Sequence, residues 1–409
     1  MPVGRIDVVP VSLPAVTAAS VGDTSQPPAA PPQTGLDLHL DQSVASCSSS
    51  AFGVTGLVNL SNTCYINTII QCFLSLPQIR NYYISDLFLQ NLKPTGNFKK
   101  INALKYLHSH YLGFNPSDIF RDLAIAFCKL ARTMWSPLPC ETDVQTSLAS
   151  FVNAISVCSN GKTKHNEIFI SPASTLNVLM LSDFRGNLQH DAQEFASWLL
   201  VALHESEKPS PPSMLASLFR GTLTSSLNCS NKHCGYISVT PNEFSILTLH
   251  FPKGDGLYTL EYLLKNFVAQ EPLTGDNIAT CRNCGHQSAS SKTLSILTAP
   301  LLLLVHLKRF HSDGRRRNNP VSFPLHGLRL PTADTATAAT STYDCVAISH
   351  HYGAHYTALA QRGARNSWFY FNDLATSAVP QEPPIHLRNT HAYLLFYIRR
   401  APCISHLHL

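Results

Sequence analysis

The sequence is poor in charged residues, since only 13% of its 409 residues are Asp, Glu, Lys or Arg. The polar surface must therefore rely on Ser, Thr, Asn and Gln. The net charge of +5, with histidine neutral, is too small to indicate nucleic-acid binding by itself. No run of about 18 apolar residues occurs, so we expect no transmembrane helix. Asp7, Pro10 and Pro14 interrupt the N-terminal apolar stretch, so we also expect no signal peptide.

The twelve cysteines lack the pattern of a disulfide framework. Most of them stand singly in apolar segments, as Cys72, Cys128 and Cys345 do. Four others form two close pairs, which is typical of a metal site. Reduced cysteines are characteristic of a reducing compartment, so we expect a cytoplasmic or nuclear protein.

The apolar pattern changes from a helical period to a strand period along the chain. Residues 1–50 are rich in Pro, Ala, Ser and Thr without periodicity, so they are predicted to form a disordered tail. From residue 56 to about 207, helices are expected from 64 onward and at 82–91, 101–112, 119–134, 147–158, 175–181 and from 189 onward. After the proline-rich break at 209–212, strands are expected at 219–228, 235–239, 244–251, 299–310, 321–323, 343–350, 355–361, 367–371 and 393–399, with a helix at 260–267. The sequence thus predicts an α+β fold, in which the apolar run at 299–310 is a central strand buried on both faces.

The stretch Gly56–Asn67 delivers a cysteine to the start of a helix. From Cys64 the apolar residues recur on one helical face, at Ile66, Ile69, Ile70, Phe73 and Leu74. We expect Asn62 or Thr63 to cap this helix and Pro77 to end it. A thiol in the first turn lies near free N–H groups and the positive end of the helix dipole, which favours the thiolate. This position suits a nucleophile, although an isolated cysteine here can equally belong to the core.

A histidine far downstream is placed where it can act as a base for this cysteine. His355 begins one expected strand, and the next strand ends at Asn372 and Asp373. An antiparallel hairpin puts the start of its first strand beside the end of its second, so we expect these three residues to lie close together. A cysteine at a helix start and an oriented imidazole form the arrangement of papain-like acyl transfer. Two nearby histidines remain alternatives for this role, His350 and His351.

Two acidic residues begin the helix expected from residue 189. Asp191 and Glu194 are three positions apart, so they share one side of its first turn. Acids stabilise a helix N-terminus, and the residues alone favour this structural interpretation. The functional alternative is a carboxylate pair for a basic substrate.

The two cysteine pairs have the spacing of zinc-knuckle half-sites. Cys229 and Cys234 form the first pair, Cys281 and Cys284 the second, and a glycine follows each pair directly. Two such half-sites give closed tetrahedral coordination, so the predicted metal is a structural Zn²⁺. The first pair is the more widely spaced, and His233 can replace one of its ligands. The alternative is a set of reduced cysteines at two turns that hold no metal.

The run Arg315–Arg317 follows Asp313-Gly314 and is expected at a hairpin tip. A solvated loop is the favoured interpretation. A nuclear address or an acidic partner is the alternative.

Several segments between Gly56 and Arg399 together carry a family resemblance. They are Gly-Leu-Val-Asn-Leu-Ser-Asn-Thr-Cys-Tyr-Ile-Asn at 56–67, Gln-His-Asp-Ala-Gln-Glu-Phe at 189–195, and the segments 219–249, 281–284, 306–310, 321–324, 343–358, 368–373 and 392–398. In these segments and their order the chain resembles the ubiquitin-specific protease family of deubiquitinating cysteine proteases. A single segment of this kind would be weak evidence, whereas the ordered set is specific.

The resemblance implies a papain-like cysteine protease fold with the architecture of a right hand. A helical thumb would span 54–208 and zinc-tipped β fingers mainly 215–300. A β-sheet palm would be built mainly from 240–252 and 296–400. Together these parts would form one catalytic domain at 54–400, followed by a short tail at 401–409.

The resemblance also assigns roles to single residues. Cys64 would be the nucleophile, His355 its base, and Asn372 the orienting third member. Asp373 would assist Asn372, and Asn59 would be the oxyanion-hole residue. The residues that would contact the substrate are Asp191, Glu194 and Tyr356, the two acids by gripping the two arginines of ubiquitin's C-terminal tail. For these acids the resemblance reverses the preference for a purely structural role.

The implied activity is hydrolysis of the isopeptide or peptide bond after ubiquitin's C-terminal glycine through a thioester. The implied partners are ubiquitin and ubiquitinated proteins, and we expect a monomer that binds neither nucleic acid nor membrane. Zinc would be structural, and catalysis would need no cofactor. The alternatives are a weak or inactive ubiquitin-binding module and a hydrolase of a ubiquitin-like modifier.

The chain departs from the family pattern at three places. Ser61 stands where the family usually has Gly before Asn-Thr-Cys, and serine does not adopt a positive φ as cheaply as glycine. Ala354 replaces the Gly before His355, and the spacing of Cys229 and Cys234 is widened. None of these changes removes a reacting atom, so we expect activity.

Overall fold

The computed structural model describes residues 53–93, 116–159, 184, 188–208, 213–252, 254, 256–273, 278, 280–287, 290–310, 315–332, 341–363, 366–379, 383 and 391–400. By internal contacts the chain divides into Met1–Ser49 and Ser50–Leu409, and every described residue belongs to the second unit. The predicted tails at 1–50 and 401–409 and the predicted helices at 101–112 and 175–181 lie outside the described residues. The predicted domain bounds therefore stay a prediction.

The helices of the described chain lie mainly before residue 220, as the apolar period predicts. They are α1 (Cys64–Phe73), α2 (Pro77–Ile84), α3 (Leu87–Asn91), α5 (Pro116–Met134), α6 (Glu141–Ser159), α8 (Ala192–Glu205) and α9 (Met214–Phe219), with α10 (Leu260–Phe267) further on. None of the described helices is long and apolar enough to cross a membrane. The predicted end of the first helix was wrong, because α1 stops at Phe73 and Pro77 instead begins α2. Proline costs nothing at a first helical position, where its missing N–H would have no partner.

An eight-stranded sheet forms the centre of the described chain. Its path is β13-β12-β11-β10-β14-β7-β3, and β9 (Leu328–Arg329) pairs with β10 beside this path. The strands are β3 (Ile246–His250), β7 (Leu302–Lys308), β10 (Thr342–Tyr352), β11 (His355–Arg362), β12 (Ser367–Asn372), β13 (Ala375–Ala378) and β14 (Ala392–Arg399). All pairs are antiparallel except β3 with β7. The α+β fold class is therefore confirmed.

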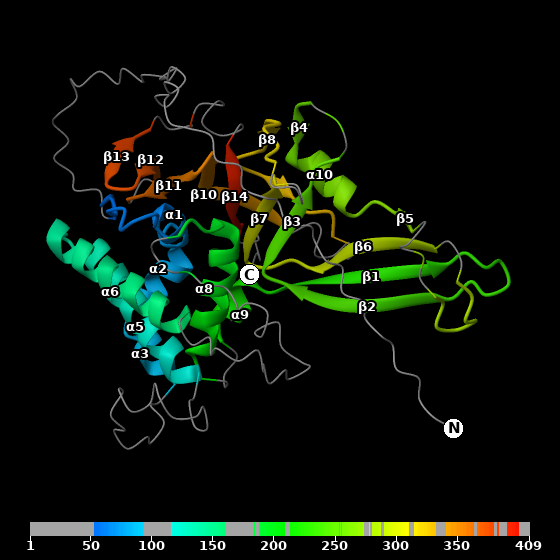
Figure 1. Ribbon diagram of the computed structural model, residues 1–409, viewed down its shortest axis with the longest axis horizontal. Coiled ribbons are helices and arrows are strands. Elements are labelled where there is room, and N and C mark those ends of the chain that lie inside the picture. The colour runs from blue at the N-terminus through cyan, green and yellow to red at the C-terminus, as the bar shows by residue number, and fades with distance from the viewer. Residues whose placement is uncertain are drawn as a thin grey trace, which may run out of the picture. The chain divides into compact units, whose positions relative to one another are not determined.

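Two apolar clusters cover the two faces of this sheet (Figure 1). The cluster that contains the helices α1, α5, α6 and α8 takes up Leu302 and Leu304 of β7. The opposite cluster contains α10 and takes up Leu303 and Val305 of the same strand. Successive side chains of a strand point to opposite faces, so β7 is buried on both faces, as its unbroken apolar run predicts.

A second sheet has the order β2-β1-β6-β5 and extends away from the first (Figure 1). Its strands are β1 (Gly221–Cys229), β2 (Ile237–Phe244), β5 (Glu271–Leu273) and β6 (Ser290–Thr298). Most of its side chains are only half-buried or exposed, in contrast to the first sheet. A short parallel pair, β4 (Tyr258–Thr259) with β8 (Val321–Ser322), completes the strands. A sheet with so little core needs another source of stability at its far end.

The interpretation of the arginine run as a solvated loop was wrong for two of its three members. Arg316 donates from Nη2 to the carbonyl of His351 at 2.8 Å, and Arg317 donates from Nη1 to the carbonyl of Pro252 at 2.8 Å. Both side chains are half-buried, and only Arg315 is exposed. Backbone carbonyls that the sequence pattern does not reveal bind these guanidinium groups, so the run ties its loop to the sheet.

Candidate active site

Cys64 is the first residue of α1 and lies at a buried position, with 4% of its surface exposed. Thr63 occupies the N-cap position, as one of the two expected residues, but it makes no side-chain hydrogen bond to the helix. Its hydroxyl instead accepts from the N–H of Leu60 at 2.8 Å. The threonine side chain therefore shapes the loop before the cysteine, and its carbonyl accepts from the N–H groups of Ile66 and Asn67 at 2.9 Å each.

All ten residues of α1 are buried, not only its apolar face. The helix lies between the sheet strands β10 and β11 on one side and α8 on the other. Its polar residues Asn67 and Gln71 therefore bond to the chain before the helix instead of water: Gln71 Nε2 donates to the carbonyl of Thr55 at 2.9 Å. In the sequence Asn67 and Gln71 look like the solvent-exposed face of the helix. In the structure they are buried and bind the loop before Cys64.

His355 begins β11, and its ring lies beside the end of β12 as the hairpin predicts. Nε2 of His355 lies 2.7 Å from Oδ1 of Asn372 and 3.9 Å from Oδ2 of Asp373. An amide oxygen only accepts hydrogen bonds, so Nε2 must carry the proton that it donates to Asn372. The other ring nitrogen, Nδ1, is then left for Cys64, which is the largest cause of the raised pKa of His355.

The surroundings of His355 raise its pKa to about 9. The hydrogen bond with Cys64 is the largest cause, and partial burial opposes it. The bond to Asn372 and the negative charges of the Cys64 thiolate and Asp373 raise the pKa further. The imidazolium form of His355 is therefore stabilised at neutral pH.

The alternative histidines, His350 and His351, lie buried in β10. The ring of His351 packs against Tyr356 at a centroid distance of 4.4 Å. Burial, the largest cause, lowers its pKa to about 4. His355 instead lies 2.7 Å from Asn372, and Cys64 is the largest cause of its raised pKa, so the structure favours His355 as the base.

Asp373 connects three parts of the site. Its Oδ2 accepts from Nδ2 of Asn59 at 3.0 Å, and its Oδ1 accepts from Nδ2 of Asn67 at 2.8 Å. Its backbone carbonyl accepts from the N–H of Leu57 at 2.9 Å. One carboxylate thus joins the loop before Cys64, the helix α1 and the strand end that carries Asn372.

Two further residues position the loop before Cys64, and sequence reasoning missed them both. Asn67 Nδ2 also lies 3.1 Å from the carbonyl of Leu57, and it is buried. Gln145 of α6 accepts from the N–H of Val58 at 2.8 Å and donates to the carbonyl of Gly56 at 3.0 Å. The polar Asn67 beside the apolar stripe of α1 was a usable signal, whereas nothing local marks Gln145.

The backbone of this loop is strained at the residue where the chain departs from the family pattern. Ser61 has a φ of 63° and Asn62 a φ of 62°. Asparagine tolerates this left-handed region, but serine adopts it at a cost. The side-chain Oδ1 of Asn59 accepts from the N–H of Thr63 at 2.9 Å and closes the turn.

Asp191, Glu194 and Tyr356 lie at the start of α8 and beside it. Asp191 caps this helix, because its carboxylate accepts from the N–H groups of Gln193 at 2.6 Å and Glu194 at 3.4 Å. The Tyr393 hydroxyl donates to the same carboxylate. Glu194 is exposed, and partial burial followed by the charge of Asp191 raises its pKa. Tyr356 is buried, with only 6% of its surface exposed, so its contribution to a binding surface is small.

The four predicted metal ligands meet at the far end of the second sheet. All sulfur atoms of Cys229, Cys234, Cys281 and Cys284 lie within 4.8 Å of one another, so the group could bind a metal ion. The Sγ atoms of Cys229 and Cys284 are 3.9 Å apart, and those of Cys234 and Cys281 are 3.8 Å apart. The widened spacing of the first pair therefore does not prevent the four sulfurs from converging.

The turns that carry these cysteines have the features of metal-binding knuckles. Gly235 and Gly285, which follow the pairs, have φ values of 57° and 67°. The side-chain amide of Asn283 donates to Cys234 at 3.5 Å and is the largest cause that lowers its pKa, to about 6. A thiolate at neutral pH is the form that binds a metal.

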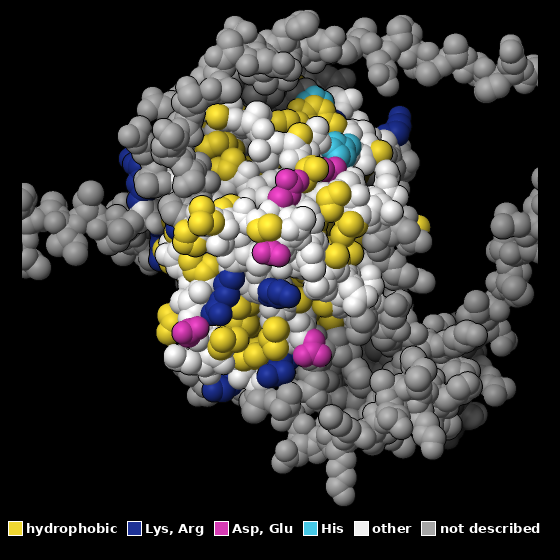
Figure 2. Space-filling view, turned by 90° about the vertical axis from the view of Figure 1, so that its left-hand side faces the viewer, with side chains coloured by type: hydrophobic (Ala, Val, Ile, Leu, Met, Phe, Trp, Pro, Cys, Tyr) yellow, Lys and Arg dark blue, Asp and Glu magenta, His cyan; other side chains and the backbone are white. Residues whose placement is uncertain are grey.

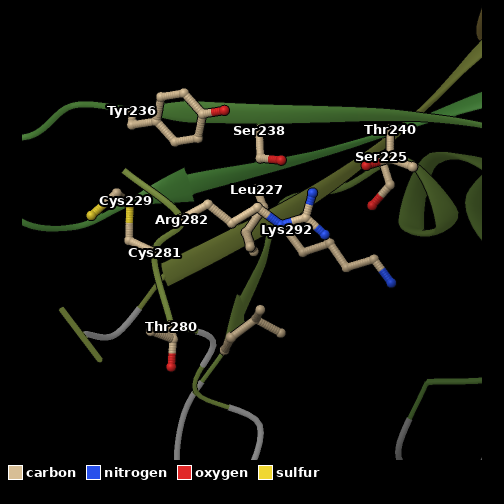
Figure 3. Close-up of a pocket in the computed structure, with 11 residues that line it drawn as sticks. Ser225, Leu227, Cys229, Tyr236, Ser238, Thr240, Thr280, Cys281, Arg282 and Lys292 are labelled. Carbon is tan, nitrogen blue, oxygen red and sulfur yellow. The ribbon is translucent and has the colours of Figure 1, made fainter. Parts of the chain in front are cut away.

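A cavity of about 250 Å³ lies beside this cluster (Figure 3). It is lined by residues of β1 and β2 and by residues of the turn that carries Cys281. Tyr236, Ser238 and Thr240 line one wall, and Arg282 and Lys292 line the other. The sequence did not predict this cavity, because its walls come from segments about 40 or more residues apart that only the sheet pairing brings together.

Comparison with known proteins places these features in a family. The family model of ubiquitin carboxyl-terminal hydrolase matches residues 55–397, most of the chain. Ubiquitin carboxyl-terminal hydrolase 2 of Rattus norvegicus is 30% identical over 87% of this chain, and that of Homo sapiens is 29% identical over 87%. These matches cover 55% and 56% of the relatives, so the chain spans about half the length of the curated relatives it matches.

Solved structures with this fold include a SAGA DUB module of Ubp8, Sgf11, Sus1 and Sgf73 bound to monoubiquitin. Its matched chain has a TM-score of 0.63 and 22% identity, over 86% of this chain and 70% of that chain. A second structure of the module, bound to ubiquitin aldehyde, also has a TM-score of 0.63, with 21% identity over 88% of this chain and 72% of that chain. This likeness confirms the papain-like α+β fold with thumb, palm and fingers. Because the family model matches most of its length, the chain belongs to the ubiquitin carboxyl-terminal hydrolase family.

Proposed function

We propose that this chain is a deubiquitinating thiol protease that hydrolyses the isopeptide or peptide bond after ubiquitin's C-terminal glycine. The observation that carries the proposal is the arrangement around His355, whose Nε2 lies 2.7 Å from Oδ1 of Asn372 and whose pKa is raised chiefly by Cys64. The family membership and the activity named for the relatives support it.

In the proposed mechanism Nδ1 of His355 takes the proton of the Cys64 thiol. The thiolate sulfur attacks the carbonyl carbon of ubiquitin's terminal glycine and forms a tetrahedral oxyanion. His355 then gives the proton to the leaving amine, and a thioester remains on Cys64. A water molecule, deprotonated by His355, attacks the thioester and releases ubiquitin with a free carboxylate. Asn372 holds the ring in one tautomer during both steps.

Asn59 is the residue that we propose to stabilise the oxyanion. One N–H of its amide group donates to Asp373, and the other is left to donate to the substrate oxygen. Because Asp373 and Thr63 hold the amide at both ends, it needs no reorientation when the negative charge forms. In other enzymes the loss of such a donor costs about 2.7–4 kcal/mol of transition-state stabilisation.

We propose that Asp191 and Glu194 bind the two arginines of the ubiquitin tail, beside Tyr356. Asp191 also caps α8, so the structural and functional interpretations of this acid are compatible. Glu194 is exposed and takes no part in the cap through its side chain, which leaves its carboxylate available to a cation.

We further propose that Cys229, Cys234, Cys281 and Cys284 hold a structural Zn²⁺. A Zn–S distance of about 2.3 Å in a tetrahedron separates the sulfurs by about 3.8 Å. The observed separations of 3.8 and 3.9 Å fit this geometry. The four ligands leave no open position, so the metal would fasten the fingers and take no part in the chemistry.

The proposed compartment is the cytoplasm or the nucleus. The proposed binding partners are ubiquitin and ubiquitinated proteins, and the protein is proposed to act as a monomer. The ten cysteines of the described chain form no disulfide bond, which supports a reducing compartment. Neither nucleic acid nor a membrane is part of the proposal.

The experiment that tests the proposed function is reaction with a ubiquitin probe that carries a C-terminal electrophile. The wild type is expected to form a covalent adduct, and Cys64→Ala is expected to form none while it still binds ubiquitin. A folded wild type that binds ubiquitin without an adduct would instead be an inactive binding module. An adduct only with a ubiquitin-like probe would identify a hydrolase of that modifier.

A further inference from the structure

The turn after Asn372 carries a leucine that neither the turn nor the core requires. The strand register pairs Asn372 with Ala375, so Asp373 and Leu374 alone connect β12 to β13. Two-residue hairpin turns favour Asn, Asp and Gly, and Asp373 with its φ of 48° fits this preference. Leu374 does not fit it, and 47% of its surface is exposed. A half-exposed apolar side chain at such a position is available for contact with another molecule.

This turn is held in a fixed position against the loop that precedes Cys64. A Cβ atom added to Gly56 would lie 2.1 Å from the carbonyl oxygen of Leu374, so the two backbones are in direct contact. The N–H of Leu57 donates to the carbonyl of Asp373 at 2.9 Å. Leu374 is therefore part of the rigid frame around the nucleophile, although its side chain is half exposed.

The order of the strands gives the direction in which a substrate crosses the site. The path runs β13-β12-β11-β10-β14, with His355 on β11. Asp191 is hydrogen-bonded to Tyr393 on β14, at one side of His355. Leu374 follows β12, at the other side. A chain that runs straight across this edge of the sheet from Asp191 past His355 would continue towards Leu374.

On the basis of the proposed function, we propose that Leu374 contacts the leaving group and selects for an acceptor lysine. The acyl side of the substrate, ubiquitin's tail, lies towards Asp191, so the leaving amine lies towards Leu374. An isopeptide bond presents the apolar four-carbon stem of a lysine there, which a leucine side chain can cover. A main-chain peptide bond instead presents polar backbone groups at the same place. Leu374 therefore favours isopeptide over peptide substrates.

The surface on this side of the molecule suits such a contact. Figure 2 shows the face that lies at the left in Figure 1, where hydrophobic and histidine side chains gather in the upper part. This is the height at which β12 and β13 lie in Figure 1.

The test compares two substrates across three variants. One substrate joins ubiquitin through an isopeptide bond to the lysine of a fluorescent peptide, and the other joins it through a peptide bond to a glycine-initiated peptide. Leu374→Ser removes the apolar contact and Leu374→Met keeps it. Leu87→Ser, at a residue of α3 that is 56% exposed, is the control. Ubiquitin aldehyde has no leaving group, so its inhibition of each variant reports only on binding of the ubiquitin side of the substrate.

For Leu374→Ser we expect kcat/KM on the isopeptide substrate to fall by about three- to tenfold, because a partly buried apolar contact is lost. The peptide substrate and the inhibition by ubiquitin aldehyde should change by less than about twofold, and Leu374→Met and Leu87→Ser should behave as wild type. An equal fall on both substrates, or no fall on the isopeptide substrate, would overturn the inference while the proposed function stands. A wild type that hydrolyses neither substrate would refute the proposed function itself, and this inference with it.

Discussion

The carboxylate of Asp373 lies 3.0 Å from the side-chain amide of Asn59, a residue 314 positions earlier in the chain. The same carboxylate binds Asn67 of α1 at 2.8 Å. The proposed oxyanion donor Asn59 and the helix that carries Cys64 are thus fastened to the strand end beside His355. Correct mutual placement of these groups, and not their presence alone, is what an acyl-transfer site needs.

Replacement of Asp373 by alanine should therefore impair catalysis without removing any reacting atom. We expect kcat to fall by about 10- to 100-fold, because Asn59 loses its fixed orientation. Steady-state kinetics of Asp373→Ala, Asn59→Ala and the double variant measure the coupling. The two effects should be strongly non-additive, since both changes remove the same oriented donor. Additive effects would contradict the assigned connection.

The raised pKa of His355 predicts how activity depends on pH. Its pKa is raised from 6.5 to about 9, chiefly by Cys64, so the imidazolium should persist at neutral pH and activity should decline as the pH passes about 9. In Cys64→Ala the pKa should fall towards the ordinary value, and NMR titration of the His355 ring measures it. An unchanged pKa in this variant would show that the thiol is not its main cause.

The same shift has a consequence for stability. The pKa in the folded state exceeds that in the unfolded state, so the protonated ring favours the folded state. This stabilisation is complete below about pH 6.5 and is lost as the pH rises through about 9. Thermal unfolding of the wild type and of Cys64→Ala across this range should show a smaller loss for the variant.

The positive φ of Ser61 predicts a stabilising substitution. Ser61→Gly should raise the free energy of unfolding by about 1 kcal/mol, because glycine adopts a φ of 63° without strain. Ser61→Ala keeps the strained backbone and serves as the matched control. We also expect kcat of Ser61→Gly to equal or exceed that of the wild type. A destabilised Ser61→Gly would mean that the serine hydroxyl makes a contact worth more than the strain.

Replacement of the two acids at the start of α8, Asp191 and Glu194, should have different effects on the free energy of unfolding. Glu194→Gln should raise KM for ubiquitin substrates and leave the free energy of unfolding almost unchanged, because this side chain is exposed and caps nothing. Asp191→Ala should raise KM and also lower the free energy of unfolding by about 1 kcal/mol, the usual worth of a helix cap. Kinetics and denaturant titration of the two variants measure both quantities. A Glu194→Gln variant with normal KM would exclude that residue from the substrate site.

Removal of the metal should affect folding before chemistry. Elemental analysis is expected to find one zinc per chain in the wild type and less in Cys281→Ser. Chelation should lower the thermal stability, because the sheet at the fingers has little core of its own. Reaction of Cys64 with a small alkylating reagent should continue in the chelated protein while it stays folded. A wild type that contains no metal and loses no stability with chelator would favour the reduced-cysteine interpretation.

Local physics in the sequence determined the elements and the reacting residues. The helical period after Cys64, the unbroken apolar run of β7 and the hairpin between His355 and Asn372 depend on neighbours in the chain, so they can be read from it. The convergence of the four cysteines was also predictable, because paired spacings followed by glycine have few structural uses.

Only the tertiary structure decided how the site is held together. Gln145 supports the loop before Cys64, Asp373 joins Asn59 to Asn67, and the backbone of Leu374 is brought against Gly56. These contacts link segments from about 90 to more than 300 positions apart. These contacts form only when distant segments pack together. They leave no periodic pattern in the sequence, so they cannot be predicted from one sequence alone.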